Sequence, residues 1–435
     1  MMYVLAFITL VVLLVAGVPV MYSFGSAVIL LAIETGFTAT SAFPTMFDKV
    51  SSVVLLAIPM FIIAGGVMEK GRIGDALIGF VEMFVSKVRG SLAIVATVAS
   101  AIFGSISGSG AATLSCIGSI IFPKMRERGY DMGKAAAVVC CSAPLGLLIP
   151  PSATQIIIAW LGNLSVLACF LSTLIPGIIL TCLISIVSYF MFRNDPQIIE
   201  NAKKARENPL TRTDVWKRSK HATPALIMPV MILGGVYGGI MTPTEAAALA
   251  VFYAIPVAIW VYKGTTPKEL AKVFVHTATS TGTLMVMICI MMVVSQILVM
   301  NDVPSLVFSF LTSISDNPKI ILLFINVFLV LVGMVMDDTS GVMLVTTLLL
   351  PMAKDLGISP YTFSAIIGVN LGMGNITPPT APFLYMTSSI AKVDTVQIMK
   401  WSLVIILFAY IPTLLLTTYV EPISTFLPSL IVKIN

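Results

Sequence analysis

Two short polar segments interrupt long apolar stretches of this sequence, and both carry oxygen-bearing side chains. The first runs from Gly104 to Gly110 and contains three serines and three glycines. The second runs from Asp337 to Gly341 and contains two adjacent carboxylates followed by a threonine and a serine. Hydroxyl, carboxylate and exposed backbone carbonyl oxygens are the ligands that hard cations prefer. Ionisable residues inside apolar sequence are costly there, so they indicate a functional site by default.

A second kind of interruption follows each polar segment after about 36 residues. The segment 143–152 contains Gly146 and the pair Pro150-Pro151, and the segment 370–380 contains Gly374 and the pair Pro378-Pro379. Glycine and proline pairs of this kind predict helices that unwind and restart, with Thr377 as the N-cap of the second restart. A broken helix frees carbonyls, which suit a small cation, and amides at a positive helix N-terminus, which suit an anion.

The two sets of interruptions are copies of one another at an offset of 228 residues. The offset superimposes Gly146 on Gly374 and both proline pairs without a gap, and it also places Pro123 on Pro351. Matching breaks in two halves of a chain indicate an internal repeat and the binding site of a secondary transporter. The basic cluster at 124–128 has only a nearly neutral counterpart at 352–355, which favours opposite orientations of the two copies.

The elements that must position these segments are transmembrane helices. Of the 435 residues, 58% are hydrophobic and 10% are charged, and residues 135–192 carry no charge at all. Soluble domains contain about 25% charged residues, so a cytosolic enzyme, a nucleic-acid binder and a disordered chain are excluded. The apolar stretches are continuous rather than alternating, which excludes a membrane β-barrel. We therefore expect an all-α polytopic membrane protein with about ten to twelve transmembrane helices.

Three regions are expected along the chain. Residues 1–192 hold the N-terminal helices and the first repeat, with a re-entrant hairpin at about 92–122 and a broken helix at about 135–165. Residues 193–220 form a basic connector, which the positive-inside rule places in the cytoplasm. Residues 221–435 hold the second repeat, with a hairpin at about 320–351 and a broken helix at about 361–391, and a C-terminal helix.

Other polar residues are better explained by structure than by catalysis. Glu245 belongs to a predicted capping box with Thr242 as the N-cap and Pro243 at the first helical position. His276 stands alone on an apolar helix, and His221 lies in the basic connector without a catalytic partner. Adjacent carboxylates make a poor acid–base pair, because both groups must converge on one substrate. We therefore expect the chain not to be an enzyme.

Four motifs together resemble a known family. Ser-Gly-Ser-Gly-Ala-Ala-Thr at 107–113, Pro-Leu-Gly-Leu-Leu-Ile-Pro-Pro-Ser at 144–152, Gly-Ile-Met-Thr-Pro-Thr-Glu-Ala-Ala at 239–247 and Asn-Ile-Thr-Pro-Pro-Thr at 375–380 are similar to the large membrane (M) subunit of tripartite ATP-independent periplasmic (TRAP) transporters. The similarity covers nearly the whole chain. It implies an ion-transporter-superfamily fold with two inverted repeats, each with a re-entrant hairpin and a discontinuous helix.

The resemblance also implies a function. It implies sodium-driven import of an organic acid anion by an elevator movement across a bacterial inner membrane, with Na⁺ as the coupling ion and no organic cofactor. The implied partners are a small four-helix membrane (Q) subunit, a periplasmic substrate-binding (P) protein and membrane lipid, and no nucleic acid. The substrate stays open between a C4-dicarboxylate, a sialic acid and another carboxylate. A self-sufficient sodium/anion symporter and a passive channel are the alternatives.

Carried onto this sequence, the family's motifs imply two groups of site residues. The expected sodium-binding residues are Ser105, Ser107, Gly108, Ser109, Gly146, Pro150, Asp337, Asp338, Asn370, Gly374 and Thr377. The expected substrate-binding residues, between the two polar tips, are Ser107, Ser109, Ser152, Thr339, Ser340 and Thr380.

Overall fold

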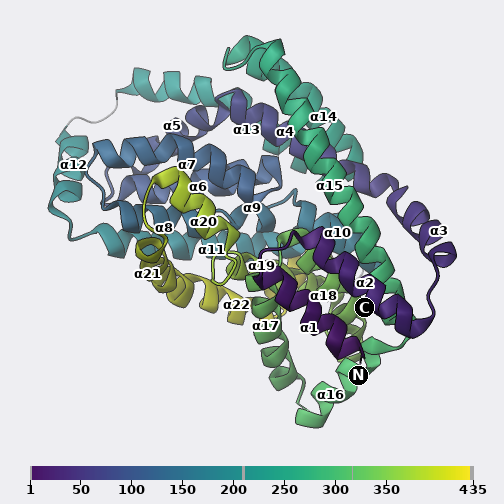
Figure 1. The fold of residues 1–435 in the computed structure, drawn as a ribbon. Coiled ribbons are helices and arrows are strands. Elements are labelled where there is room, and N and C mark those ends of the chain that lie inside the picture. Colours follow the sequence, from purple (N-terminus) through teal and green to yellow (C-terminus); the bar gives the residue numbers. More distant parts are fainter. Residues whose placement is uncertain (1, 208–210, 316, 432–435) are drawn as a thin grey trace.

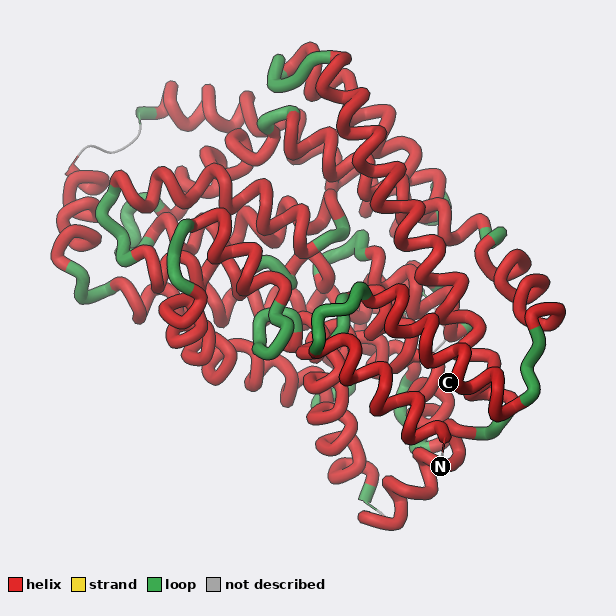
Figure 2. The backbone as a smooth tube through the Cα atoms, viewed as in Figure 1, coloured by secondary structure: helices red, strands yellow, loops and turns green. Residues whose placement is uncertain are grey.

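The computed structural model describes residues 2–207, 211–315 and 317–431, and within these ranges the chain forms helices and no strands (Figure 1, Figure 2). The protein is therefore an all-α polytopic membrane protein, as the composition predicts. By length and composition, seven helical segments of the described residues could cross a membrane: 53–70, 132–162, 166–192, 243–261, 267–300, 318–335 and 395–419. The number is below the predicted ten to twelve, because several other apolar helices are too short to span alone.

Three helices precede the first long membrane segment, 53–70. The apolar N-terminal stretch divides at Gly17, whose φ of +81° suits only glycine, so that α1 (Met2–Val15) and α2 (Val20–Thr35) are separate helices. A third helix, α3 (Ala39–Val50), follows and exposes Phe43 and Phe47. It lies at one edge of the molecule, where it packs against α15 (Figure 1).

A group of long helices forms one side of the molecule. It consists of α4 (Ala57–Lys70, after the short turn Val53–Leu56), α13 (Arg212–Tyr237), α14 (Pro243–Pro256, continued by a π-helical turn at Val257–Val261) and α15 (Pro267–Met300). Helix α4 packs against α14 and α15. The predicted capping box of α14 is confirmed, since Glu245 accepts from the backbone of Thr242 at 2.8 Å while Thr242 accepts from that of Glu245 at 3.2 Å.

The repeat appears as two series of helices in the same order. The first series is a hairpin, α6 (Ser91–Ser107) and α7 (Gly110–Glu127), followed by the broken helix α8 (Met132–Ser142), α9 (Leu145–Leu148) and α10 (Ala153–Gly162). The second is a hairpin, α17 (Pro318–Val335) and α18 (Asp338–Asp355), followed by the broken helix α19 (Pro360–Gly374) and α20 (Pro382–Ala391). A short helix precedes each hairpin, namely α5 (Ile73–Val85) and α16 (Val303–Ile314).

The remaining helices connect and close the two series. A 27-residue helix, α11 (Val166–Phe192), follows the first broken helix and packs against α6 and α19. The second broken helix is followed by a segment of four elements: α21 (Thr395–Ile405), a π-helical turn (Ile406–Tyr410), α22 (Ile411–Tyr419) and α23 (Pro422–Ser429). Tyr410 is fully buried and donates to the carbonyl of Cys141 at 2.7 Å, which ties this last segment to α8.

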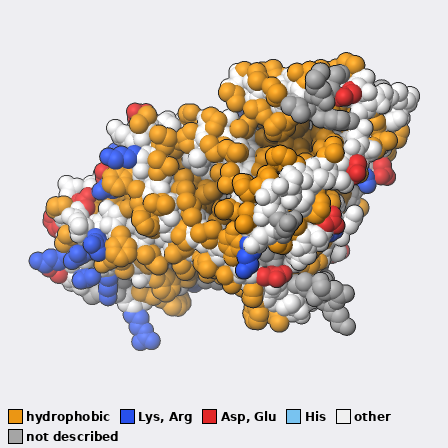
Figure 3. All heavy atoms as spheres, turned by 90° about the horizontal axis from the view of Figure 1, so that it is seen from below, with side chains coloured by type: hydrophobic (Ala, Val, Ile, Leu, Met, Phe, Trp, Pro, Cys, Tyr) orange, Lys and Arg blue, Asp and Glu red, His pale blue; other side chains and the backbone are white. Residues whose placement is uncertain are grey.

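The basic connector is largely helical. It contains α12 (Pro196–Glu207) and the first residues of α13, where Thr211 and Asp214 form a capping box. The hydroxyl and backbone amide of Thr211 hold the pKa of Asp214 below its usual value by hydrogen bonding to the ionised carboxylate. Lysines and arginines gather at the end of the molecule that holds α12, while much of the remaining surface in this view is apolar (Figure 3).

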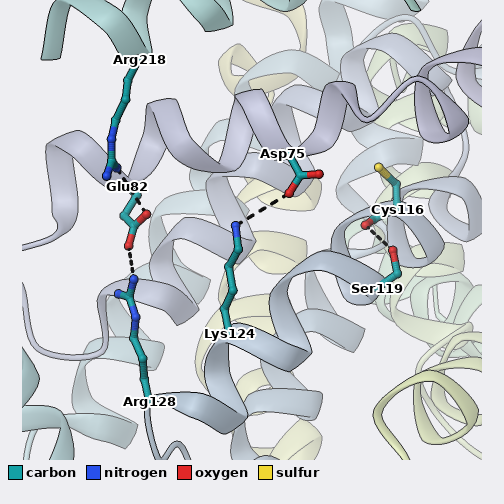
Figure 4. A network of polar contacts seen from close by, with 7 residues as sticks. All are labelled: Asp75, Glu82, Cys116, Ser119, Lys124, Arg128 and Arg218. Atoms are coloured by element: carbon teal, nitrogen blue, oxygen red, sulfur yellow. Dashed lines mark hydrogen bonds and ion pairs between the residues drawn. The ribbon is translucent and has the colours of Figure 1, made fainter. Parts of the chain in front are cut away.

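Ion pairs join the first hairpin to its neighbours at this basic end (Figure 4). The carboxylate of Glu82 on α5 lies 2.7 Å from the guanidinium of Arg128, just after α7, and 3.5 Å from that of Arg218 on α13. The ammonium of Lys124 on α7 lies 3.8 Å from the carboxylate of Asp75 on α5. Helix α5 is thus held both to the hairpin and to α13 by charge.

Candidate functional site

The tip of the first hairpin is a tight turn between two helices. Gly108 ends α6 with a φ of +60°, a conformation that favours glycine. Ser109 then caps α7, since its hydroxyl oxygen accepts from the amide of Ala112 at 3.4 Å. The hydroxyl of Thr113 donates to the carbonyl of Ser109 at 2.8 Å and fixes the turn from inside α7.

This tip lies in the break of the first discontinuous helix. The amide of Ala153 donates to the carbonyl of Gly108 at 3.4 Å, so the restart of the broken helix is bonded to the tip. One turn earlier, Gly104 faces Gly146 so closely that a Cβ on Gly104 would lie 2.6 Å from the Cα of Gly146. Glycine at both positions permits this contact between two backbones.

One predicted side chain of the first unit has no partner among the described residues. Ser152 is fully buried between the proline pair and α10, and its hydroxyl makes no hydrogen bond. The hydroxyl of Ser107 is also buried but lies 3.3 Å from both Thr113 Oγ1 and the Ser109 carbonyl. The hydroxyl of Ser105 donates to Ile102 within α6 at 2.6 Å. A bound water, ion or ligand could supply the partner that an unpaired buried hydroxyl lacks.

At the second tip, the two adjacent carboxylates serve different neighbours. Asp337 is the N-cap of α18 and accepts from the amide of Thr339 at 3.1 Å and from the hydroxyl of Ser340. Asp338 is half-buried, and its carboxylate accepts a hydrogen bond from the side-chain amide of Asn375. Asp337 thus stabilises the helix start, while Asp338 links the second tip to the second break.

Thr380 fixes the second break against its own hairpin. Its amide and hydroxyl both donate to the carbonyl of Met334, at 3.1 and 2.6 Å. A Cβ on Gly374 would run into the backbone of Gly333, so this contact also requires glycine. Thr339 supplies only its amide to the capping of α18, and no hydrogen bond of its hydroxyl occurs in the described residues.

The predicted role of Thr377 as an N-cap is wrong. The second broken helix restarts at Pro382, with Ala381 before it, and the hydroxyl of Thr377 instead donates to the carbonyl of Met373 at 2.7 Å. Residues that precede prolines avoid the helical region, so the pair Pro378-Pro379 lies inside the break rather than in a first turn. The first broken helix also restarts after its prolines, at Ala153.

Asn370 lies one turn before the second break, in a buried polar cluster with Asn326 of α17. The side-chain amide of Asn370 donates to Oδ1 of Asn326 at 2.7 Å, and that of Asn326 donates to the hydroxyl of Thr418 on α22 at 3.1 Å. The Oδ1 atoms of Asn370 and Asn375 are buried without a partner in the described residues. The sequence reasoning missed Asn326 and Asn375, although Asn326 is a lone amide in an apolar stretch, which is a usable signal.

The two units are interlocked. Gln155 in α10 and Ser364 in α19 are both fully buried, and the Ser364 hydroxyl donates to the Gln155 side chain at 2.5 Å. Helix α20 of the second unit packs on α7 of the first, with the ring of Phe383 against Gly110 at the first tip. Each tip therefore lies at its own break, and the second broken helix also reaches the first tip.

This arrangement offers oxygen ligands and helix ends at two places. Among the residues that the structure describes, no group of three or more His, Cys, Asp or Glu side chains comes together. A cation would instead be held by hydroxyls, amide oxygens, backbone carbonyls and the single carboxylate of Asp338, which is a donor set for a hard ion. Helices α7, α10, α18 and α20 all begin at a tip or a break, and their positive N-termini favour an anion.

The chain is similar to known membrane transport proteins, both to a family model and to individual relatives. The family model described as "Tripartite ATP-independent periplasmic transporter, DctM component" matches residues 7–423. The C4-dicarboxylate TRAP transporter large permease protein DctM of Vibrio cholerae is 33% identical over 98% of this chain and 97% of its own. The sialic acid TRAP transporter large permease protein SiaM of the same species is 30% identical over 88% of each chain.

A solved structure supports the fold. The YdaH transporter of Alcanivorax borkumensis, described as having an unusual topology, superimposes with a TM-score of 0.61 over 89% of this chain and 91% of its own, at 14% identity. The family model and the large permease relatives define the class as a membrane transporter. The chain belongs to the DctM family and is a large permease component of a TRAP transporter.

Proposed function

We propose that this chain is the permease of a sodium-driven transporter that imports an organic acid anion, with Na⁺ bound at each hairpin tip and the anion between the tips. The observation that carries the proposal is the presence of buried, unpartnered oxygens beside both tips. Ser152 supplies one at the first break, and Asn375 and Asn370 supply two at the second. A buried polar atom without a partner is unfavourable by about 1–3 kcal/mol, and a cation would relieve this cost.

The second site has a charge that the first lacks. Asp338 is bonded to Asn375, so the carboxylate and the free Oδ1 of that asparagine lie at the same break. Na⁺ bound there would offset the half-buried negative charge of Asp338 and stabilise the joined tip and break. Four helix N-termini at the tips and breaks would then attract the carboxylate of the substrate.

We infer the mode of movement from the interlocked units. Because Gln155, Ser364 and Phe383 join the two broken helices and the first tip, the tips and breaks would move as one body. The long helices α4, α14 and α15 would serve as the frame for an elevator movement, with the two repeats in inverted orientation. Substrate would be delivered by a periplasmic binding protein (P), in a bacterial inner membrane, with a small membrane subunit (Q) beside the frame.

The substrate is an organic acid anion. Relatives are named for C4-dicarboxylate and for sialic acid, and both compounds carry carboxylates that helix N-termini would recognise. In a tripartite system, selection of the acid would lie largely with the binding protein.

Sodium-driven uptake in reconstituted vesicles tests the proposal. The chain, its small membrane subunit and its binding protein would be reconstituted, and uptake of labelled succinate and N-acetylneuraminate would be measured with an inward Na⁺ gradient and with choline in its place. Asp338→Asn should reduce uptake by about tenfold or more, since asparagine keeps an acceptor for Asn375 but removes the negative charge, and a contact to a charged group contributes about 1.5–3 kcal/mol. Asp355→Asn, at the exposed end of the same helix, should leave uptake unchanged.

The same vesicles separate the alternatives. Uptake by the chain without the other two proteins would favour a self-sufficient symporter. Flux that is independent of Na⁺ would favour a passive channel and would contradict the proposal. An enzyme that uses the two aspartates is disfavoured, because Asp337 is engaged in capping α18 and only Asp338 reaches the break.

A further inference from the structure

The side-chain amide of Asn370 is held in one orientation by its neighbours in α17 and α19. Its nitrogen donates to the carbonyl of Ile366, one turn earlier in α19, at 2.8 Å and to Oδ1 of Asn326 at 2.7 Å. A backbone carbonyl can only accept, and the two bonds use both protons of the amide. The Oδ1 atom of Asn370 is therefore directed away from both neighbours, and it is buried without a partner in the described residues.

Asn326 is oriented by the same kind of contact. Its nitrogen donates to the carbonyl of Leu322 in α17 at 2.9 Å and to the hydroxyl oxygen of Thr418 in α22 at 3.1 Å. If the amide of Asn326 turned over, its oxygen would face the Leu322 carbonyl, which is also an acceptor. Asn326 thus has to present Oδ1, and not its nitrogen, to Asn370.

One oxygen of this buried cluster is left without a hydrogen bond. The three side chains, Asn326, Asn370 and Thr418, are all buried. The Thr418 hydroxyl lies 3.4 Å from Oδ1 of Asn326, so this proton also has an acceptor. Every proton of the cluster is then engaged, and none is available for Oδ1 of Asn370. The partner of this oxygen has to come from outside the cluster, and an amide oxygen is a ligand that hard cations prefer.

The unpartnered oxygen belongs to the last turns before the second break. Asn370 precedes Gly374 by four residues, so the two lie on the same face of α19. A Cβ on Gly333 of α17 would lie 3.1 Å from the Cα atoms of both Gly374 and Leu371, so the two helices meet backbone to backbone there. Helix α17 therefore fixes both the backbone of the break and the side chain of Asn370.

The first repeat has a contact at the corresponding place, but without a spare oxygen. Ser142 of α8 superimposes on Asn370 at the offset of 228 residues. Thr97 of α6 lies next to the position that superimposes on Asn326. The Ser142 hydroxyl lies 2.7 Å from the carbonyl of Val138, one turn earlier, and 3.0 Å from Thr97 Oγ1. Both repeats thus join the hairpin to the broken helix here, and only the amide of the second repeat adds an oxygen that this joint does not use.

We propose that Asn326 is a positioning residue for a cation site at the second break. It does not contact the ion. It accepts a proton of the Asn370 amide and thereby keeps Oδ1 of Asn370 directed at the ion. An amide that turned over would present N–H groups, which repel a cation, so a fixed orientation strengthens binding. The inference rests on the proposed function, since it deepens the sodium site at the second break.

The affinity for Na⁺ tests this role. The full-length chain in lipid nanodiscs would be titrated with radiolabelled Na⁺ in choline buffer, and the site weakened in Asp338→Asn identifies the second break. Asn326→Leu removes the acceptor, and it should raise the dissociation constant of that site about tenfold, as loss of a residue that orients a metal ligand typically does. Thr418→Val removes only one acceptor of Asn326, and it should raise the constant about threefold.

Thr413→Val is the matched control for Thr418→Val. Thr413 lies on the same helix and is fully buried, but its hydroxyl donates to the carbonyl of Ala409 within that helix at 2.8 Å. Both variants remove one buried hydroxyl, so both should lower the melting temperature in choline buffer. Only Thr418→Val should weaken the binding of Na⁺. A residue that merely supports the fold would lower the melting temperature without changing the dissociation constant.

Unchanged Na⁺ affinity in Asn326→Leu would overturn the inference, and so would equal weakening by Thr418→Val and Thr413→Val. If Asn326→Leu does not fold, unchanged affinity in Thr418→Val overturns it instead. Loss of Na⁺ binding in Asp338→Asn with normal binding in Asn326→Leu and Thr418→Val would remove only the role of Asn326. Weakened Na⁺ binding in these two variants, with no sodium-driven uptake by the parent, would remove only the proposed function.

Discussion

Replacing Gly104 with alanine is expected to separate the first hairpin from the first break. The added Cβ would lie 2.6 Å from the Cα and 2.9 Å from the nitrogen of Gly146, and both are backbone atoms that cannot turn away. Overpacking of this kind costs about 1–3 kcal/mol, and a clash between two backbones lies at the upper end of that range because neither can move aside. Alanine in place of glycine inside a helix gains back up to about 1 kcal/mol. The balance predicts that Gly104→Ala lowers the free energy of unfolding by about 1–2 kcal/mol.

Gly79 provides the matched control. It also lies inside a helix, α5, but an added Cβ would meet nothing within 4 Å, so Gly79→Ala carries the gain in helix propensity without the clash. Thermal unfolding of the purified chain, followed by tryptophan fluorescence, should place Gly104→Ala below the parent and Gly79→Ala at or above it. Sodium-driven uptake should fall only in Gly104→Ala. If both variants are as stable and as active as the parent, the close contact between tip and break does not exist.

The remaining predictions concern three other contacts. Asn326→Leu removes the acceptor of the Asn370 amide, and it should destabilise the chain by about 1–3 kcal/mol in thermal unfolding; a neutral effect would contradict the buried cluster. Glu82→Gln removes the charge between two arginines, so it should lower the melting temperature slightly in 50 mM NaCl and less in 1 M NaCl. The effect is small because partly exposed ion pairs contribute little and are screened by salt. A decrease in melting temperature that is independent of salt would mean that packing dominates. Thr242→Ala should cost about 1 kcal/mol by loss of the α14 cap, and Thr242→Ser should retain most of that stability; equal losses in both would argue against the capping box.

The positions of the interruptions could be predicted from the sequence because glycine and proline act through the backbone. Proline lacks an amide and glycine adopts positive φ, so the pairs at 150–151 and 378–379 and the turn at Gly108 stand out against apolar sequence. The residue at which each broken helix begins again could not be predicted in the same way. Each break extends beyond its prolines to Ala153 or Pro382, because packing against the hairpins fixes the restart.

The hydrogen-bond partners of the site residues could not be predicted from the sequence, because tertiary packing brings them together. Asp337 and Asp338 are adjacent and chemically alike, yet one caps α18 and the other meets Asn375, 37 residues away. Asn326 meets Asn370 across 44 residues for the same reason.

The binding of radiolabelled Na⁺ to the purified chain tests the central claim most directly. Lipid nanodiscs that hold the parent chain, Asp338→Asn or Asp355→Asn would be equilibrated with increasing Na⁺ in choline buffer. The account predicts saturable binding by the parent and by Asp355→Asn, with the site at the second break weakened about tenfold or more in Asp338→Asn. Absence of saturable binding, or equal binding by all three chains, would contradict the claim that the hairpin tips and helix breaks form sodium sites.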